Sequence, residues 1–189
     1  MRRVFSSHSE VCHVWAQQTQ SEGKAGNIFF AGKSIYSYGR HFEMARFIDE
    51  ETVFITSRGY SVSTAKHLSI VRRAVSHKTV FEVPSFTDHA ENVAHFITSA
   101  REQFDKAKRA RTHVTWCISS AHQYRDKASE YIARFGYAVV PAEHIELWNA
   151  IQTGTYLDGD VQAALLKKER EAKKAEQEAA SIATTSLGI

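Results

Sequence analysis

The segment from Asn27 to Ile48, NIFFAGKSIYSYGRHFEMARFI, constrains the fold most, because polar and apolar residues alternate along much of it. A period of two places every second side chain on the same face of a β-strand. Turn residues interrupt the alternation around Gly32 and at Gly39. The pattern predicts two strands joined by a hairpin and then a third strand, which together form an antiparallel meander.

Two later segments, TVFITS from Thr52 and TVFEV from Thr79, are short and rich in β-branched and aromatic residues. Each is predicted to be a strand, and Pro84 ends the second one because proline cannot donate to a strand ladder. The predicted fold class is therefore α+β. We expect a mainly antiparallel sheet of about four to five strands over residues 28–83, with packing helices and a helical C-terminal half.

Capping boxes mark the starts of two helices. Ser7 with Glu10 predicts a helix over about residues 8–19, and Asp88 with Glu91 begins a longer amphipathic helix. In both pairs the first side chain accepts a bond from a first-turn amide, and the glutamate reaches back to the cap residue.

The remainder of the chain is predicted to be one more strand followed by helices. THVTWCIS, from Thr112, is predicted to be the strand, DKASEYIARFG a helix ending at Gly136, and a further helix follows Pro141. KKEREAKKAEQEAA favours helix but has almost no apolar stripe. We therefore expect a single globular domain over residues 1–157 and a charged, helical or partly disordered tail over residues 158–189.

The stretch from Arg58 to Lys78, RGYSVSTAKHLSIVRRAVSHK, contains five Lys or Arg and no acidic residue. Wound as a helix, it places Lys66, Arg73 and neighbouring polar residues on one side and an apolar stripe on the other. His67 projects toward the packed side, as a hydrogen-bonded core group or a partly buried titrating one. A solvated basic face explains the pattern, but a helix without acids also suits an anionic partner.

Composition limits the classes of function. The 189 residues carry a net charge of +3, so nucleic-acid binding would require a local basic patch. Two cysteines make neither a disulfide framework nor a zinc site, and no P-loop, dinucleotide fingerprint or HExxH motif occurs. We expect no metal and no cofactor, and, because no long apolar run occurs, a cytoplasmic protein without a membrane partner.

Three segments, SSHSEVCHVWAQQ, SIYSYGRHFEMARF and SRGYSVSTAKHLSIVRRAVSH, resemble a family of small uncharacterised proteins encoded by phages and plasmids. The shared patterns are SSHxEVxHxWA, IYSYGxHFxxAR and RxYSxxTxKHxSxVR, in this order, over roughly the first half of the chain. The resemblance implies a mobile-element setting in a host cell, and it implies no mechanism. The matching positions are Ser7, His8, His13, Trp15, Tyr36, Ser37, Tyr38, His41, Arg46, Arg58, Tyr60, Ser61, Lys66, His67 and Arg72.

The first class of function is a module that binds RNA or single-stranded DNA through the basic helix and aromatic side chains. Cations neutralise phosphates, and aromatic rings stack on bases. No RRM, KH or zinc-finger signature occurs, so this hypothesis depends on charge and aromatic residues alone. The candidate residues are Tyr36, Tyr38, Arg46, Arg58, Tyr60, Lys66, Arg72 and Arg73.

The second class is a metal-independent phosphodiesterase-type enzyme. A pair of imidazoles, His8 or His13 with His41 or His67, would act as general base and acid, while Arg46 or Arg58 holds the anion. His13, His41 and His67 are the candidate catalytic residues. The chain contains ten histidines, so chance pairs are expected and only geometry can decide.

The third class is an inhibitor or modulator that binds a host protein, for example a component of a defence system. A patch that binds phosphate and a patch that binds an acidic protein use the same Lys and Arg side chains, so the sequence leaves the three classes and the oligomeric state open. We predict that the candidate residues meet around one cleft, near the junction of the central strands and the 63–77 helix.

Overall fold

The computed structural model describes residues 2–59, 61–110 and 112–186. Contacts divide the chain into two compact units, Met1–Asn92 and Val93–Ile189. The prediction of one domain over residues 1–157 followed by a tail stays a prediction.

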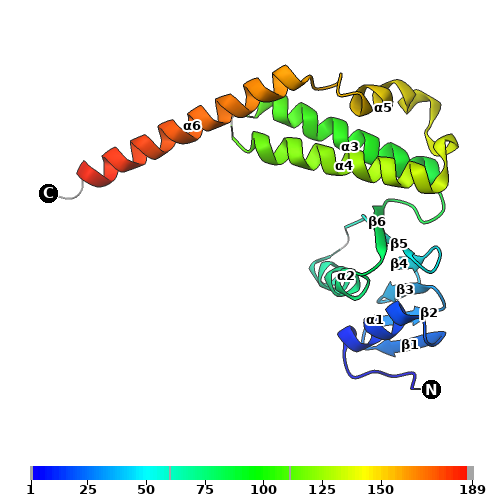
Figure 1. Ribbon diagram of the computed structural model, residues 1–189. Coiled ribbons are helices and arrows are strands. Elements are labelled where there is room, and N and C mark those ends of the chain that lie inside the picture. Colours follow the sequence, from blue (N-terminus) through cyan, green and yellow to red (C-terminus); the bar gives the residue numbers. More distant parts are fainter. Residues whose placement is uncertain (1, 60, 111, 187–189) are drawn as a thin grey trace. The chain divides into compact units, whose positions relative to one another are not determined.

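The first unit is built on a six-stranded mixed sheet whose strands neighbour one another in chain order (Figure 1). Four neighbouring pairs are antiparallel, and the last pair is parallel. The α+β class and the mainly antiparallel sheet are confirmed, while the strand number is larger than predicted. The strands are β1 (Glu22–Ala25), β2 (Ile28–Ala31), β3 (Ser34–Ser37), β4 (Glu43–Phe47), β5 (Thr52–Thr56) and β6 (Thr79–Val83).

Strand β1 was missed because EGKA has a short, charged and glycine-containing sequence. Its position depends on close packing at Gly23, where an added Cβ would lie 2.6 Å from the rings of both Phe5 and Phe30. Strand β6 lies parallel to β5 because helix α2 (Val62–Ala74) carries the chain back across the sheet between them. A hairpin could join only antiparallel neighbours.

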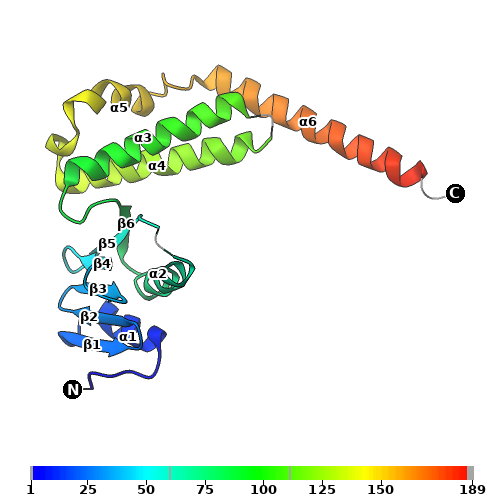
Figure 2. The ribbon, with the colours of Figure 1, turned by 180° about the vertical axis from the view of Figure 1, so that it is seen from behind.

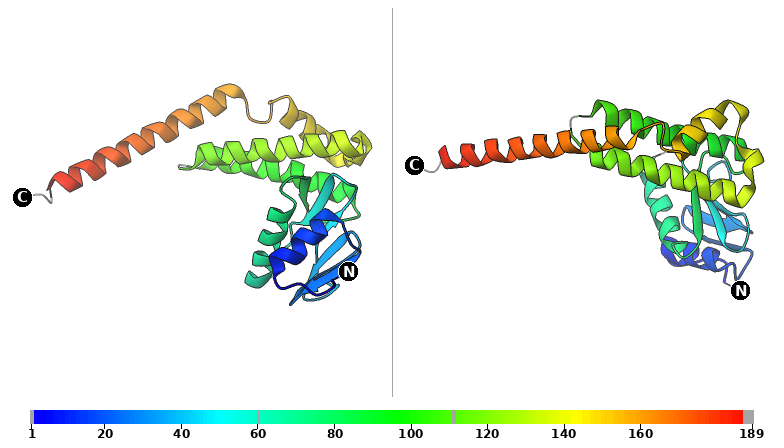
Figure 3. Two further views of the ribbon diagram at one scale, coloured as in Figure 1. Left: turned by 60° about the horizontal axis from the view of Figure 1, so that its bottom comes forward. Right: turned by 45° about the horizontal axis from the view of Figure 1, so that its top comes forward.

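Helices α1 (His8–Gln17) and α2 pack side by side on one face of the sheet (Figure 3). The main core of this unit lies between them and the strands, and Trp15 at its centre donates its indole N–H to the Lys33 carbonyl at 3.2 Å. The Ser7 cap is confirmed, because its hydroxyl accepts from the Glu10 amide at 3.1 Å. The Glu10 carboxylate instead accepts bonds from the amide and hydroxyl of Ser6.

The second unit is helical, and α3 (His89–Arg109), whose first residues belong to the first unit, lies beside α4 (Val114–Phe135) (Figures 1 and 2). The rings of Phe96 and Tyr131 join these helices, with centroids 5.7 Å apart. The other helices are two short 3-10 helices (Tyr137–Val139 and Ala142–His144), α5 (Ile145–Gln152) and α6 (Gly159–Ser186).

The strand predicted for THVTWCIS is wrong, because this segment belongs to the start of α4. Its buried residues, Val114, Cys117, Ile118 and Ala121, recur at the spacing of a helix face. An eight-residue window is too short to separate that spacing from the alternation of a strand. The predicted end of this helix at Gly136 is confirmed, with φ at 92° and the Gly136 amide bonded to the Ile132 carbonyl at 2.8 Å.

Helix α6 contacts α4, in part through the buried carboxylate of Glu169, and every side chain from Arg170 to Ala180 is exposed. Glu169 accepts bonds from the amide and the hydroxyl of Thr115 at 2.8 and 2.6 Å, and it pairs with Lys173 at 3.0 Å. Glu169 therefore caps the start of α4, where the residue before the helix, His113, makes no side-chain cap. Among the described helices, none combines the length and apolar character that a membrane span needs.

We expect Glu169→Ala to lower the free energy of unfolding of the second unit by about 1 kcal/mol, the usual cost of a lost helix cap. The bonds from Thr115 lower the pKa of Glu169 from 4.5 to about 2. Because the folded pKa is depressed, the cap stabilises α4 above about pH 4.5 and is lost as the pH falls toward about 2. Urea unfolding across this range measures both effects. Glu171→Ala, at an exposed position of the same helix, is the matched control.

Candidate functional site

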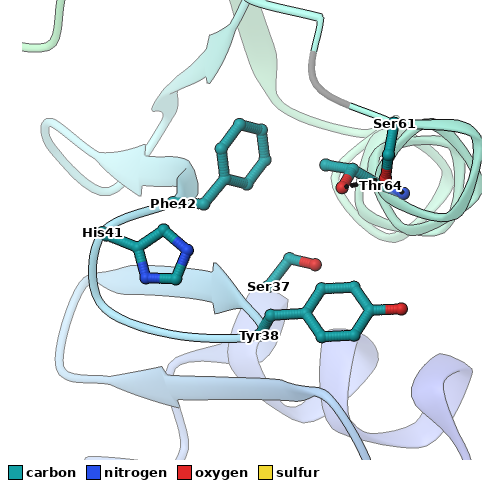
Figure 4. Close-up of a pocket in the computed structure, with 6 residues that line it drawn as sticks. All are labelled: Ser37, Tyr38, His41, Phe42, Ser61 and Thr64. Atoms are coloured by element: carbon teal, nitrogen blue, oxygen red, sulfur yellow. Dashed lines mark hydrogen bonds between the residues drawn. The ribbon is translucent and has the colours of Figure 1, made fainter.

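A pocket of about 330 Å³ lies between the end of β3 and the start of α2. Figure 4 shows the side chains that surround it: Ser37, Tyr38, His41, Phe42, Ser61 and Thr64. Four of them carry hydroxyls and one carries an imidazole. The pocket therefore offers hydrogen-bond donors and acceptors, and only Phe42 supplies a purely apolar wall.

Tyr38 stands at this pocket in a backbone conformation that tyrosine rarely adopts. It follows β3 with φ at 62°, and its amide donates to the Asn27 carbonyl at 2.7 Å. A non-glycine residue in this left-handed region costs roughly 1–2 kcal/mol. The strained turn holds the Tyr38 ring 55% exposed, with its centroid 5.7 Å from that of His67.

The first turn of α2 supplies the other side of the pocket. Ser61 caps this helix, because its hydroxyl accepts from the Thr64 amide at 3.2 Å and bonds to the Thr64 hydroxyl at 2.9 Å. The first-turn amides of a helix that have no carbonyl partner carry partial positive charge. The pocket therefore lies beside the positive end of the α2 dipole, and the Thr64 amide there is already bonded to Ser61.

A buried hydrogen bond joins β3 to α2 directly behind the pocket. The Ser37 hydroxyl lies 2.7 Å from Nδ1 of His67, and the imidazole tautomer sets which of the two donates. Ser37 is 1% exposed and His67 is 6% exposed. Burial lowers the pKa of His67, and the neighbouring His8, whose ring centroid lies 4.9 Å away, lowers it further. Neutral imidazole is therefore favoured inside the fold.

The structure brings residues from three separated segments to this place: His8 from α1, Ser37 to His41 from β3 and its turn, and Ser61 to His67 from α2. Arg58 lines an adjacent hollow of about 240 Å³, which shares His41 and Phe42 with the pocket. Of the predicted residues, Tyr38, His41 and His67 thus meet at one site and Arg58 lies beside it.

Other predicted residues lie elsewhere or already have partners. His13 is exposed on α1, and its Nε2 lies 3.1 Å from the side-chain nitrogen of Gln17. Tyr36 lies on the opposite face of the sheet from Ser37, because neighbouring strand residues alternate. Arg46 makes a two-pronged pair with Glu43, at 2.8 and 2.7 Å. Tyr60 lies outside the described residues.

The basic stretch contains no acidic residue, but acidic side chains from other segments pair with two of its cations. Arg72 donates two bonds to Glu82 on β6, at 2.7 and 2.9 Å, and Lys78 pairs with Glu51 at 3.0 Å. Lys66 and Arg73 remain exposed, and no ion pair within the described ranges involves either of them. Lys66 and Arg73 can therefore bind an external anion without first breaking an ion pair within the described residues.

Sequence reasoning did not select the residues that form the pocket wall, namely Ser37, Phe42, Ser61 and Thr64. A signal was available for all four, because each is a specified position of the shared patterns IYSYGxHFxxAR and RxYSxxTxKHxSxVR. Serine and threonine are common at caps and turns, so their residue type alone does not indicate a site.

Comparison of the chain with protein-family models, with curated proteins and with solved structures finds no match in any of the three. Within the described ranges, no three or more His, Cys, Asp or Glu side chains are grouped as metal ligands.

Tyr38→Gly is expected to be more stable than Tyr38→Ala by about 1 kcal/mol. Both variants lose the same ring, but only glycine adopts a φ of 62° without steric cost. Chemical denaturation of the two variants measures the difference. Equal stability would show that the turn relaxes and that Tyr38 is not strained.

The stability of the first unit is expected to fall as the pH drops below about 6.5. The pKa of His67 is lower in the folded chain than its usual 6.5, so the unfolded state takes up the proton first and is favoured. The loss levels off once the pH is below the folded pKa. Urea midpoints between about pH 8 and pH 5 test this. His67→Gln should flatten the dependence of the urea midpoint on pH. His77→Gln, at an exposed position just after α2, should leave this dependence unchanged.

Proposed function

We propose that the first unit binds single-stranded nucleic acid, RNA or DNA, at the pocket between β3 and α2, as an accessory protein of a phage or plasmid. The observation that carries this proposal is the pocket itself: a hollow at a helix start that is lined by hydroxyls and an imidazole, with an exposed aromatic ring at its edge. A phosphate and a base are the two groups that such a combination recognises.

The phosphate is assigned to the α2 side of the pocket. Backbone amides at a helix start and nearby hydroxyls are common phosphate ligands in proteins. Here Ser61 and Thr64 provide hydroxyls at that point, and Lys66 lies exposed within the first turns of the same helix. Arg58 is 68% exposed in the adjacent hollow, and its one ion pair among the described residues is a long one, at 3.9 Å from Glu91.

The base is assigned to Tyr38. Its ring is the exposed aromatic surface of the pocket, and a turn with an unfavourable φ holds it in place. A ring held in advance loses little conformational freedom when a base stacks on it. Stacking of this kind contributes about 1–3 kcal/mol per base and tolerates any base, so the expected specificity is for single strands and not for a sequence.

A second candidate function, a metal-independent phosphodiesterase, is favoured by the bond between Ser37 and His67. A serine hydroxyl 2.7 Å from a neutral imidazole resembles the pairing of a nucleophile with its general base. Ser37 also lines the pocket that is assigned to the phosphate. His41, on the same pocket, is placed to serve as an acid toward the leaving oxygen.

Fluorescence polarisation with labelled single-stranded RNA, single-stranded DNA and duplex DNA tests the proposed binding. Affinity should fall with salt, with a log–log slope of roughly 0.7 to 0.9 per phosphate neutralised. Replacing Lys66 and Arg73 together by Ala should flatten the slope by about one to two units. Tyr38→Ala should weaken single strands about tenfold and duplex less, because only unpaired bases stack on a ring.

Lys174→Ala removes an exposed cation from α6 in the second unit and is the matched control. No binding at ~50 mM salt, where phosphate contacts are strong, would contradict the proposal and favour a host protein as the partner. Cleavage of the strand in the presence of chelator, abolished by Ser37→Ala, would instead establish the enzyme.

A further inference from the structure

The face of the sheet turned away from α1 and α2 carries an aromatic pair. Phe29 on β2 and Tyr36 on β3 are register partners, and their rings are stacked with centroids 5.1 Å apart and planes at 18°. Both side chains are half-buried. Lys24 on β1 is the partner of Phe29 on its other side, so a cation and two rings form one row across three strands.

A hollow of about 280 Å³ lies beside this row, and three cations and one acid contribute to its largely apolar wall. Arg3, Lys24 and Arg40 line it together with Phe29, and all three cations are exposed. Glu22 is the one acidic side chain in its described lining, and Arg3 pairs with it at 2.9 Å. Lys24 and Arg40 therefore leave the hollow with an excess of positive charge.

Arg40 connects this hollow to the pocket between β3 and α2. Its guanidinium carbon lies 5.6 Å from the centre of the Tyr36 ring, while the next residue, His41, lines the pocket. His41 follows Arg40 in the chain, with Cα atoms about 3.8 Å apart, so residues that line the two recesses are neighbours at this turn.

We infer that this sheet face is a second subsite for the same single strand, in which the Phe29–Tyr36 pair and Arg40 receive a base and Lys24 receives the following phosphate. The inference depends on the proposed function and adds the length and path of the strand. Aromatic rings on a sheet surface accept bases regardless of sequence, and an arginine plane above a ring adds a further stacking surface.

The chemistry of the face favours a nucleic acid over an acidic peptide. Carboxylates would be satisfied by the cations alone and would gain nothing from a flat pair of stacked rings. A strand that alternates bases with phosphates matches a row in which rings and cations lie next to each other. Binding of a polyglutamate peptide with the same dependence on Tyr36 would overturn the assignment.

The test compares oligothymidylates of roughly 3 and 12 nucleotides, because only the longer one spans both recesses. The double variant Tyr36→Ala, Arg40→Gln should bind the longer strand about tenfold more weakly and should bind the shorter strand as the unaltered protein does. Tyr38→Ala should weaken the binding of both strands. If the Tyr36 and Arg40 variant binds the longer strand like the unaltered protein, the second subsite is refuted while the pocket stands.

If the Tyr36 and Arg40 variant also fails to bind the shorter strand, the inference is refuted, because the two recesses are then not separate subsites. Failure of the unaltered protein to bind either strand would overturn the proposed function and the inference together. The three results differ, so the two ideas fail in distinguishable ways.

Folding is controlled with conservative changes. Tyr36→Phe keeps the ring stacked on Phe29 and should bind the longer strand nearly as well as the unaltered protein. If Tyr36→Ala does not fold, Arg40→Gln and Lys24→Gln at exposed positions carry the test. Photocrosslinking with an iodouracil-substituted strand gives an independent readout: the expected adducts are on β2 or β3, and adducts confined to α2 would contradict the second subsite.

Discussion

The hydrogen bond between Ser37 and His67 is the interaction on which the arrangement of the first unit depends. It is a buried polar contact beside an otherwise apolar core, and it ties the end of β3 to the middle of α2 at 2.7 Å. Leaving either group unpaired in this position would cost about 1–3 kcal/mol, so the bond selects one register of the helix on the strand. In that register the first turn of α2 and the turn after β3 face each other across the pocket.

The same contact determines how the polar residues around it are divided. Because Ser37 points inward, Tyr36 must point outward, and the two faces of β3 therefore serve different recesses. Tyr38 then leaves the strand in a left-handed conformation and returns an aromatic ring to the inner side. Tyr36 therefore belongs to the stacked pair on the sheet face, Ser37 makes the buried hydrogen bond, and Tyr38 borders the pocket.

Electrostatics separates cations that support the fold from cations that are available to a ligand. Arg46 and Arg72 each donate two hydrogen bonds to a glutamate. These bonds fix the orientation of the guanidinium group and occupy donors that an external phosphate would need. Lys66, Arg73 and Arg40 are exposed and form no ion pair within the described residues. Charge counted along the basic stretch does not identify Arg72 as paired, because its neutralising acid, Glu82, lies on β6. The partner of Arg46, Glu43, lies three residues away on the same strand.

The sequence by itself determined the local structure wherever a short-range pattern was unambiguous. Alternation from Asn27 to Ile48 gave the central strands, Ser7 gave the start of α1, and Gly136 gave the end of α4. It failed where the pattern was short or mixed, at β1 and at the start of α4, since a few residues fit both periods. Tyr38, His41 and His67 were selected by residue type, and the structure places them together. Their companions Ser37, Ser61 and Thr64 were not selected, and Tyr36 went to the other face. Only the tertiary structure decided these points, because burial, ion pairing and the side of a sheet are set by segments far apart in the chain, whose approach no local pattern encodes.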